Sequence, residues 1–140
     1  MDTEWIAKIS VVIPAPIEKV WDALTNPVMI RQYFFGTEVV SDWKVGHAIV
    51  FSGTWEDKPY EDKGTILELE KEKLLKYNYW SSFSGTDDIP ANYANITYAL
   101  APDRNGTILT ITQDHCKTPE ARDHSAKNWG IIVDGLVKLM

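Results

Sequence analysis

The sequence contains one cysteine, Cys116, and only three histidines. A single cysteine excludes an intrachain disulfide framework and fits a reducing compartment. His47, His115 and His124 form no HExxH pair, and no CxxC motif occurs. We therefore expect no metal site, and the lack of a dinucleotide or phosphate-binding glycine motif gives no reason to expect a cofactor.

Basic charge and long apolar runs are also scarce. The chain carries 14 lysines and arginines against 20 aspartates and glutamates, for a net charge of −6, and the basic residues are scattered. This excludes the electrostatic footprint of a nucleic-acid or anionic-membrane binder. No run approaches the roughly 18 apolar residues of a membrane helix. The polar residues 1–10 show no secretion signal, so we expect a cytoplasmic protein that binds neither nucleic acid nor membrane.

Recognisable catalytic motifs are missing as well. The chain has no GxSxG elbow, and His115 and Cys116 are neighbours in an expected strand, where side chains point to opposite faces and cannot readily share a proton. The acidic pairs Glu56-Asp57 and Glu61-Asp62 are interpreted as a solvated loop rather than an acid–base pair. Enzymatic activity stays open, but a binding protein is favoured.

The chain does have apolar and aromatic residues in quantity. Of its 140 residues, 44% are hydrophobic and 11% are aromatic. This suits one globular domain, residues 1–140, with a single sizeable core.

One long helix is expected at residues 118–140. Thr118 suits the N-cap and Pro119 the first helical position. The apolar stripe of this helix recurs at spacings of three and four and comprises Trp129, Ile132, Val133 and Leu136. Gly130 and Gly135 each weaken a helix by about 1 kcal/mol relative to Ala. They indicate close approach of another backbone or a ligand, unless they are simply tolerated.

Strand-like patterns precede that helix. They are expected at residues 6–13, 37–40, 48–55, 63–70, 74–82, 93–100 and 107–115. Two short helices, opening at Pro16 and at Asn26-Pro27, follow the first strand. Turn signals separate the last six runs without a helix-length segment, so we expect an antiparallel meander. The order β-α-α-β6-α predicts an α+β fold in which a curved sheet wraps around the C-terminal helix.

Alternation along two strands predicts which side chains face the helix. The expected inward residues are Ile49, Phe51, Gly53 and Trp55 in one strand and Leu109, Ile111, Gln113 and His115 in another. These residues give the sheet one apolar side that the terminal helix can cover.

The stretch IPAPIEKVWDALTNP at residues 13–27, followed by Arg31-Gln32-Tyr33-Phe34, resembles the opening of a known family. This family is named after the activator of the heat-shock protein 90 ATPase and belongs to the START-like, birch-pollen-allergen-like superfamily. Support comes from GTILELE at 64–70, LKYNYW at 75–80 and GTILTIT at 106–112. The resemblance implies a helix-grip fold with a cavity between the sheet and the C-terminal helix. It does not fix a function, because such families bind or process many unrelated small apolar molecules.

The aromatic side chains and a few polar ones on the expected inward faces form the candidate ligand-binding set. Its members are Phe51, Trp55, Tyr77, Tyr79, Gln113, His115, Asn128, Trp129, Ile132 and Gly135. Apolar walls with a few convergent polar groups are typical of a small-molecule pocket.

Three classes of function remain open. The favoured one is binding of a hydrophobic or aromatic small molecule in the cavity. The second is a cyclase or hydrolase acting on polyketide-like substrates, with Tyr79, Gln113 or His115 as acid, base or oxyanion contacts. The third is a co-chaperone that touches a heat-shock ATPase, which the family name alone suggests. A weak homodimer also stays open.

Overall fold

A computed structural model describes residues 5–82 and 85–140, apart from the side chain of Trp55. Its elements are β1 (Trp5–Ile13), α1 (Ile17–Thr25), α2 (Pro27–Tyr33), β2 (Glu38–Ser41), β3 (Ala48–Trp55), β4 (Lys58–Glu70), β5 (Leu74–Tyr79), the 3₁₀ turn η1 (Pro90–Asn92), β6 (Ala94–Asp103), β7 (Gly106–Cys116) and α3 (Pro119–Lys138). The predicted order β-α-α-β6-α is confirmed, and the short η1 is added before β6.

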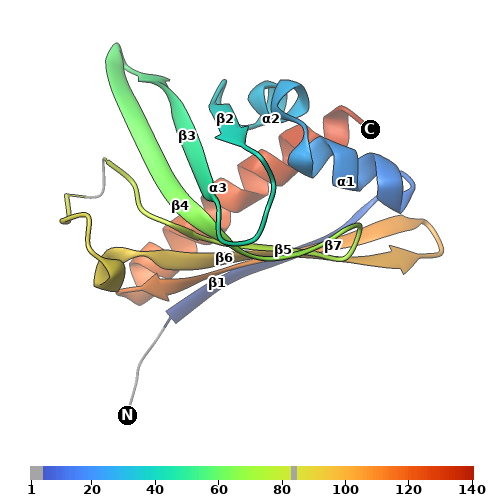
Figure 1. The fold of residues 1–140 in the computed structure, drawn as a ribbon. Helices are drawn as coiled ribbons and strands as arrows, with labels where there is room; N and C mark the ends of the chain where they lie inside the picture. The colour runs from blue at the N-terminus through green and yellow to red at the C-terminus, as the bar shows by residue number, and fades with distance from the viewer. Residues whose placement is uncertain (1–4, 83–84) are drawn as a thin grey trace.

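The strands form one curved antiparallel sheet. Its order is β1-β7-β6-β5-β4-β3-β2, so the first strand of the chain closes beside the last. In Figure 1, β3 and β4 bend away from the plane of β1, β6 and β7, and the helices lie on the concave side. The fold is therefore the predicted α+β helix-grip arrangement, with the curved sheet around α3.

Local signals place the ends of the helices as expected. The Thr118 hydroxyl accepts a hydrogen bond of 3.0 Å from the Ala121 N–H, which caps α3. The Asn26 side chain accepts one of 3.0 Å from the Val28 N–H and caps α2 in the same way. The predicted stripe of α3 is buried, with Trp129, Ile132, Val133 and Leu136 all facing the sheet side of the molecule. Burial of each such side chain contributes roughly 1.5–3 kcal/mol.

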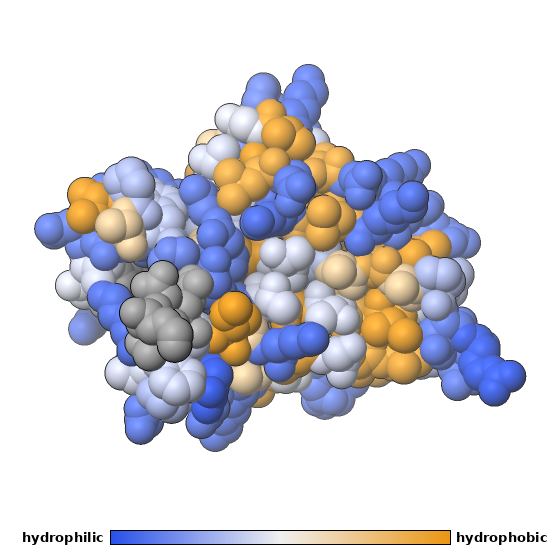
Figure 2. Space-filling model, turned by 90° about the horizontal axis from the view of Figure 1, so that it is seen from below, coloured by the Kyte–Doolittle hydropathy of each residue, from blue (hydrophilic) through white to orange (hydrophobic). Residues whose placement is uncertain are grey.

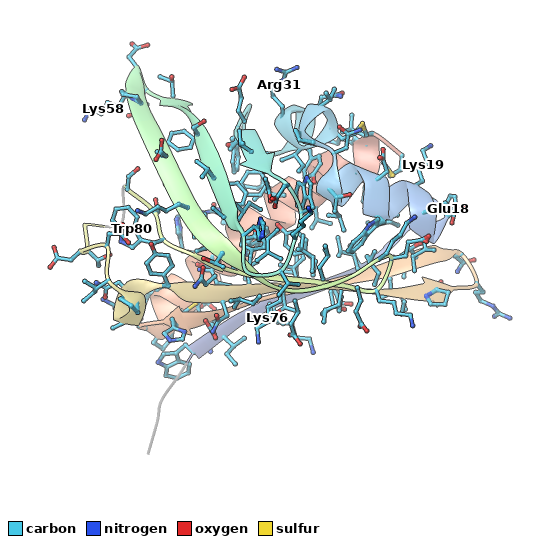
Figure 3. All side chains as sticks on the ribbon, viewed as in Figure 1. Glu18, Lys19, Arg31, Lys58, Lys76 and Trp80 are labelled. Carbon is cyan, nitrogen blue, oxygen red and sulfur yellow. The ribbon has the colours of Figure 1, made fainter. Side chains whose placement is uncertain are left out.

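The core fills the space between the sheet and the helices. Ile66, Tyr77 and Leu109 are among its most deeply buried side chains, at 0–1% exposure. Figure 3 shows this space occupied by side chains, whereas the labelled Glu18, Lys19, Arg31, Lys58 and Lys76 lie at the periphery. These labelled charged side chains thus stay outside the core, which consists mainly of apolar and aromatic groups.

The hairpin of β3 and β4 is longer than the sequence predicted. Trp55 pairs with Lys58, and the two turn residues between them, Glu56 and Asp57, have positive φ angles of 49° and 66°. Positive φ at both central residues is the mark of a type I′ hairpin turn, which usually contains glycine or asparagine. The interpretation of Glu61 and Asp62 as loop residues is therefore wrong, because both belong to β4.

A bulge interrupts β7 near its end. Ala7 of β1 pairs with Gln113, and the next pair joins Trp5 to Cys116, so Asp114 and His115 of β7 lie opposite the single residue Ile6 of β1. His115 has a positive φ of 58°, and its side chain is 45% exposed. The buried face therefore ends at Gln113, and the prediction that His115 continues it is wrong.

The two glycines of α3 have different surroundings. A Cβ on Gly135 would lie 3.3 Å from the Cβ of Tyr33, so this glycine lets α3 approach the end of α2. A Cβ on Gly130 would meet nothing within 4 Å. Another backbone therefore comes close at Gly135, and that Gly135 also contacts a ligand stays a prediction.

The convex face of the sheet carries mixed side chains. Figure 2, seen from below, shows apolar patches interrupted by polar groups over this side. The exposed Ile6 and Val12 of β1 contribute apolar area, and the Ser10 and Thr110 hydroxyl oxygens lie 3.1 Å apart across β1 and β7. None of the helices in residues 5–82 and 85–140 combines the length and apolarity needed to cross a bilayer.

Buried tyrosines form a polar layer inside the core. The Tyr77 and Tyr98 hydroxyl oxygens lie 2.8 Å apart, and the Tyr33 hydroxyl donates to the Ala23 carbonyl at 2.8 Å. Burial raises the pKa of Tyr33, Tyr77 and Tyr98, because a phenolate would lose its hydration there. Each of these groups thus holds its proton in the folded chain.

The glycine pair of α3 gives the first prediction. Gly130→Ala should raise the free energy of unfolding by about 0.5–1 kcal/mol, because alanine favours the helix and the site is open. Gly135→Leu should lower it by about 1–3 kcal/mol, because the larger side chain overlaps Tyr33. Urea denaturation of both variants measures the difference. A stabilised Gly135→Leu variant would contradict the close packing of α3 on α2.

A second prediction concerns alkaline pH. A raised pKa in the folded state means that the tyrosines contribute their full stability below the ordinary tyrosine pKa of 10.0, and that this contribution is lost as pH rises toward the raised value. The free energy of unfolding should therefore fall between about pH 9 and pH 11, where unfolded tyrosines ionise. Tyrosinate absorbance should appear together with unfolding, and Tyr98→Phe should reduce the pH dependence. Ionisation near pH 10 without any loss of stability would contradict the buried layer.

Candidate functional site

A cavity of about 680 Å³, here called the inner cavity, lies between the concave sheet face and α3. Its walls come from the end of α2 and from β3 to β7 as well as from α3. The lining residues are Phe34, Phe35, Thr37, Phe51, Tyr60, Asp62, Tyr77, Tyr79, Ser81, Ile96, Gln113, His124, Ser125, Asn128, Trp129, Ile131 and Ile132. Strand alternation explains this set, because residues of β4 and β5 two positions apart face the same side.

Aromatic rings form a continuous wall around the inner cavity. The Phe51 ring lies 5.9 Å from that of Phe34 in a stacked arrangement and 5.6 Å from those of Tyr77 and Tyr79. The Phe34 ring also contacts Trp129 edge-on, with 6.0 Å between centroids. These distances are typical of favourable aromatic pairs. The wall therefore offers both ring faces and ring edges to a ligand.

Gln113 joins the sheet to α3 at the cavity. The Trp129 Nε1–H donates to Gln113 Oε1 at 2.8 Å, and Gln113 Nε2 donates to the Ser125 hydroxyl at 3.5 Å. The first bond satisfies the buried indole N–H and fixes which way the amide points. Gln113 therefore holds the Trp129 side chain in place and also lines the inner cavity.

Asp62 brings a carboxylate to the inner cavity. The residue is only 7% exposed, and its Oδ2 accepts a hydrogen bond from the Tyr79 hydroxyl. Its Oδ1 accepts from the Ser82 N–H at 3.0 Å and from the Ser82 hydroxyl at 3.4 Å. Burial, and then the charge of Asp62 and its hydrogen bond, raise the pKa of Tyr79. The Tyr79 phenol therefore stays protonated and donates to Asp62.

The mouth of the inner cavity lies between the end of α2 and α3. Phe35 and Ile131 line it and are 50% and 51% exposed, respectively. Phe35 and Gly36 have positive φ angles of 55° and 73°, so the chain turns sharply after α2. This conformation is uncommon for a bulky residue and is found where surrounding structure or function requires it. It places an aromatic side chain at the rim.

A second space, here called the outer cavity, has a volume of about 800 Å³ and shares Tyr79, Ser81, Gln113 and Ser125 with the inner one. It also touches His115, Cys116 and Lys117 at the start of the β7–α3 connection. The shared residues place it next to the inner cavity, beside the end of β7 and the first turns of α3.

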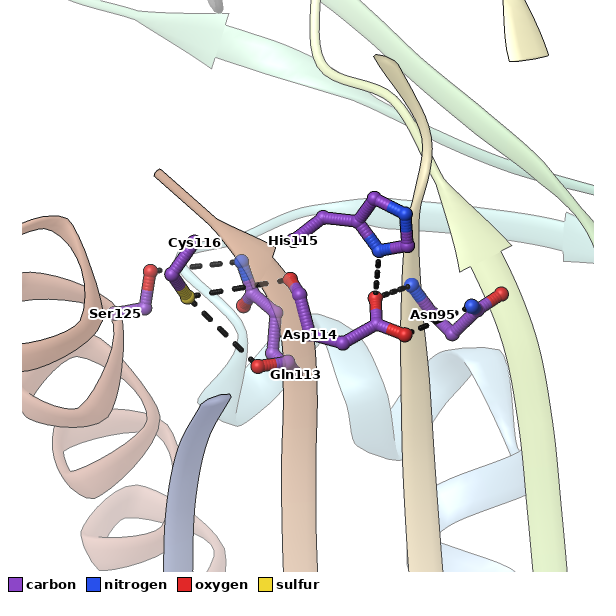
Figure 4. A network of polar contacts seen from close by, with 6 residues as sticks. All are labelled: Asn95, Gln113, Asp114, His115, Cys116 and Ser125. Atoms are coloured by element: carbon purple, nitrogen blue, oxygen red, sulfur yellow. Dashed lines mark hydrogen bonds and ion pairs between the residues drawn. The ribbon is translucent and has the colours of Figure 1, made fainter. Parts of the chain in front are cut away.

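His115 and Cys116 both contact Asp114 in a network of polar contacts, His115 at its carboxylate and Cys116 at its carbonyl (Figure 4). His115 Nδ1 lies 2.5 Å from Asp114 Oδ1, and the Cys116 thiol donates to the Gln113 carbonyl at 3.8 Å. Although burial favours the neutral acid, hydrogen bonds from the Asn95 N–H and side chain and from His115 lower the pKa of Asp114. The bonds between Asn95 and Asp114 tie the bulge to β6, and none of the bonds drawn in Figure 4 joins the thiol to the imidazole.

Most of the predicted site residues do meet at the inner cavity. Those that line it are Phe51, Tyr77, Tyr79, Gln113, Asn128, Trp129 and Ile132. His115 lines only the outer cavity, Gly135 packs on Tyr33, and the side chain of Trp55 lies outside the described part of the structure. That these residues contact a ligand stays a prediction.

The sequence interpretation missed two groups of wall residues. Asp62 and Tyr60 were missed because their segment was taken for a loop, although Tyr60, Asp62, Gly64 and Ile66 alternate as in a strand. Pro59 disguised that alternation, since proline inside a run argues against a strand. Phe34 and Phe35 were missed because nothing in the local pattern indicated that they would line a cavity or that Phe34 would stack on Phe51 of β3.

Within residues 5–82 and 85–140, no group of three or more His, Cys, Asp or Glu side chains could hold a metal ion. Over the same residues, no buried side-chain nitrogen or oxygen lacks a hydrogen-bond partner. The buried polar side chains of the cavity wall therefore have hydrogen-bond partners within the protein.

Comparison with solved structures supports the fold. The solution structure of protein ChR145 from Cytophaga hutchinsonii is 45% identical, with a TM-score of 0.87 over 99% of this chain and 95% of that one. A crystal structure of protein MLL2253 from Mesorhizobium loti is 24% identical, with a TM-score of 0.80 over 96% and 95%. DynU16, a protein of the dynemicin biosynthetic locus, is 17% identical, with a TM-score of 0.79 over 95% of this chain and 46% of DynU16.

The last two similarities, at under 25% identity, show the fold alone. Among curated proteins, no match to this chain was found. The family model described as Activator of Hsp90 ATPase homolog 1-like protein matches residues 14–140. The motifs, the helix-grip fold and this match agree, and the chain belongs to the family of Activator of Hsp90 ATPase homolog 1-like proteins, within the START-like superfamily.

Proposed function

We propose that this protein binds an apolar small molecule with an aromatic portion in the inner cavity. The observation that carries the proposal is the cavity itself, about 680 Å³ between the sheet and α3. Small-molecule sites in proteins commonly measure about 300–1,000 Å³ and combine apolar walls with a few placed polar groups. The aromatic wall and the polar set of Gln113, Asn128 and Ser125 fit this description.

The walls favour an aromatic ligand over a purely aliphatic one. Phe51 and Tyr77 stand at a 38° angle, and Trp129 is edge-on to Phe34, so an inserted ring can meet both ring faces and ring edges. A ligand that loses about 200–300 Å² of apolar surface gains roughly 5–7 kcal/mol. Before the cost of immobilisation, this gain corresponds to dissociation constants of roughly 10–200 micromolar, so tighter binding also needs polar contacts from the ligand.

The cyclase or hydrolase alternative gains no specific support from the acid–base groups. A general base must be deprotonated at the working pH so that it can accept a proton. Burial raises the pKa of Tyr79 and keeps its phenol protonated. His115 lies at the outer cavity, where it pairs with Asp114. Contact with a heat-shock ATPase and a weak homodimer stay predictions from the sequence, because neither depends on the cavity.

Ser125 and Lys127 provide a matched test of the proposed site. Ser125 lines both cavities from α3, whereas the exposed Lys127 lines neither. Ser125→Leu should fill part of the shared space and weaken binding of naphthalene-type ligands at least about tenfold, which corresponds to 1.4 kcal/mol. Lys127→Leu adds the same side chain to the outside of α3 and should leave the affinity unchanged.

Tryptophan fluorescence titration measures these affinities, because Trp129 forms part of the wall. Mass spectrometry of small molecules extracted from freshly purified protein would identify a natural ligand. Equal affinity in Ser125→Leu and Lys127→Leu, or no binding of any aromatic probe by the unmodified chain, would overturn the proposed site.

A further inference from the structure

We infer that Asp62 makes the inner cavity selective for aromatic ligands that carry a hydrogen-bond donor, and that it rejects ligands that are anionic at the same position. The inference rests on the proposed function, because it concerns the ligand of the same cavity. It adds the chemical class of that ligand: a ring system with a hydroxyl or a protonated amine.

The position of Asp62 in β4 aims its carboxylate at the cavity. Its neighbours two positions away, Tyr60 and Gly64, share its side of the strand, and Tyr60 lines the same cavity. Exposure of Asp62 is 7%, so solvent contributes little to its hydrogen bonding. A carboxylate in such a place normally has a charged partner or a full set of donors.

The described residues do not provide Asp62 with a cation. No ion pair joins it to a lysine, arginine or histidine among residues 5–82 and 85–140, and the adjacent Lys63 pairs with Asp88 at 2.5 Å. The negative potential of the carboxylate is therefore directed into the cavity without a nearby compensating charge.

The hydrogen bonds of Asp62 leave room for one more donor. An ionised carboxylate can accept about four hydrogen bonds, two at each oxygen. Oδ1 already accepts from the Ser82 N–H and hydroxyl, whereas Oδ2 accepts from the Tyr79 hydroxyl. The second acceptor site of Oδ2 is the one that a ligand donor can use, beside the aromatic ring of Tyr79.

The energetic consequences differ sharply between ligand types. A donor on the ligand gains a hydrogen bond to a charged acceptor, which is worth about 1.5–3 kcal/mol, or roughly 10- to 100-fold in affinity. An anionic group at the same place meets a like charge at low dielectric and is excluded. A hydroxyl and a protonated amine share the donor chemistry, and the experiment distinguishes them.

The first measurement compares four probes of similar shape with the unmodified protein. These are 2-naphthol, 2-naphthylmethylamine, 2-methoxynaphthalene and 2-naphthoate, titrated at neutral pH by tryptophan fluorescence. We expect 2-naphthol, the amine or both to bind about tenfold or more tightly than 2-methoxynaphthalene, with 2-naphthoate the weakest. The order of the first two shows which donor the cavity prefers.

The second measurement assigns the selectivity to Asp62. Asp62→Asn should remove the preference for donors and raise the relative affinity of 2-naphthoate, while binding of 2-methoxynaphthalene changes by less than about twofold. Tyr79→Phe keeps the carboxylate and frees its Oδ2, so the preference should persist. Asp134→Asn is the charge-matched control, because Asp134 is 70% exposed on α3 and pairs with Lys138.

The outcomes separate this inference from the proposed function. Binding of none of the probes would overturn the cavity as a ligand site altogether. Equal binding of 2-naphthol, the amine and 2-methoxynaphthalene, or an unchanged donor preference in Asp62→Asn, would overturn only the role of Asp62. If Asp62→Asn does not fold, the probe order in the unmodified protein decides, because a carboxylate in the wall cannot favour 2-naphthoate.

Discussion

The packing of α3 onto the concave face of the sheet is the constraint on which the cavity depends. Trp129 carries this contact, because its ring is buried between Phe34 and Tyr98 while its N–H is held by Gln113. At the other end of the helix, Gly135 lets α3 close on Tyr33 of α2. The helix therefore packs closely on α2 near Gly135, whereas the inner cavity separates it from the sheet near Ser125.

Curvature of the sheet completes the same arrangement. The β3–β4 hairpin bends away from the plane of β1, β6 and β7 (Figure 1), and Phe51 of β3 and Asp62 of β4 line the inner cavity together with residues of α3. Its long pairing depends on a tight turn at Glu56 and Asp57. The polar groups of this aromatic wall have partners within the protein, because Asp62 is hydrogen-bonded to Tyr79, Gln113 to Trp129, and Tyr77 to Tyr98.

The sequence predicted the element order and the buried face of α3, because periodicity and capping are local properties that short segments show by themselves. Thr118, Pro119 and the stripe from Trp129 to Leu136 are examples. Prediction from the sequence failed where a turn or a bulge interrupts the regular strand pattern. Because the β3–β4 turn contains no glycine, Asp62 was assigned to a loop, and the bulge in β7 turns His115 away from the buried face. Phe34, just after α2, reaches the cavity by stacking on Phe51 of β3, a long-range contact that no local signal encodes.

The central claim is that an aromatic small molecule occupies the inner cavity. Intermolecular nuclear Overhauser effects between a bound naphthalene probe and isotope-labelled protein test this claim most directly. The account predicts contacts from the probe to the Ile96 and Ile132 methyl groups and to the Phe51 and Trp129 rings. Contacts confined to Ile6 and Val12, on the convex face of the sheet, would contradict it.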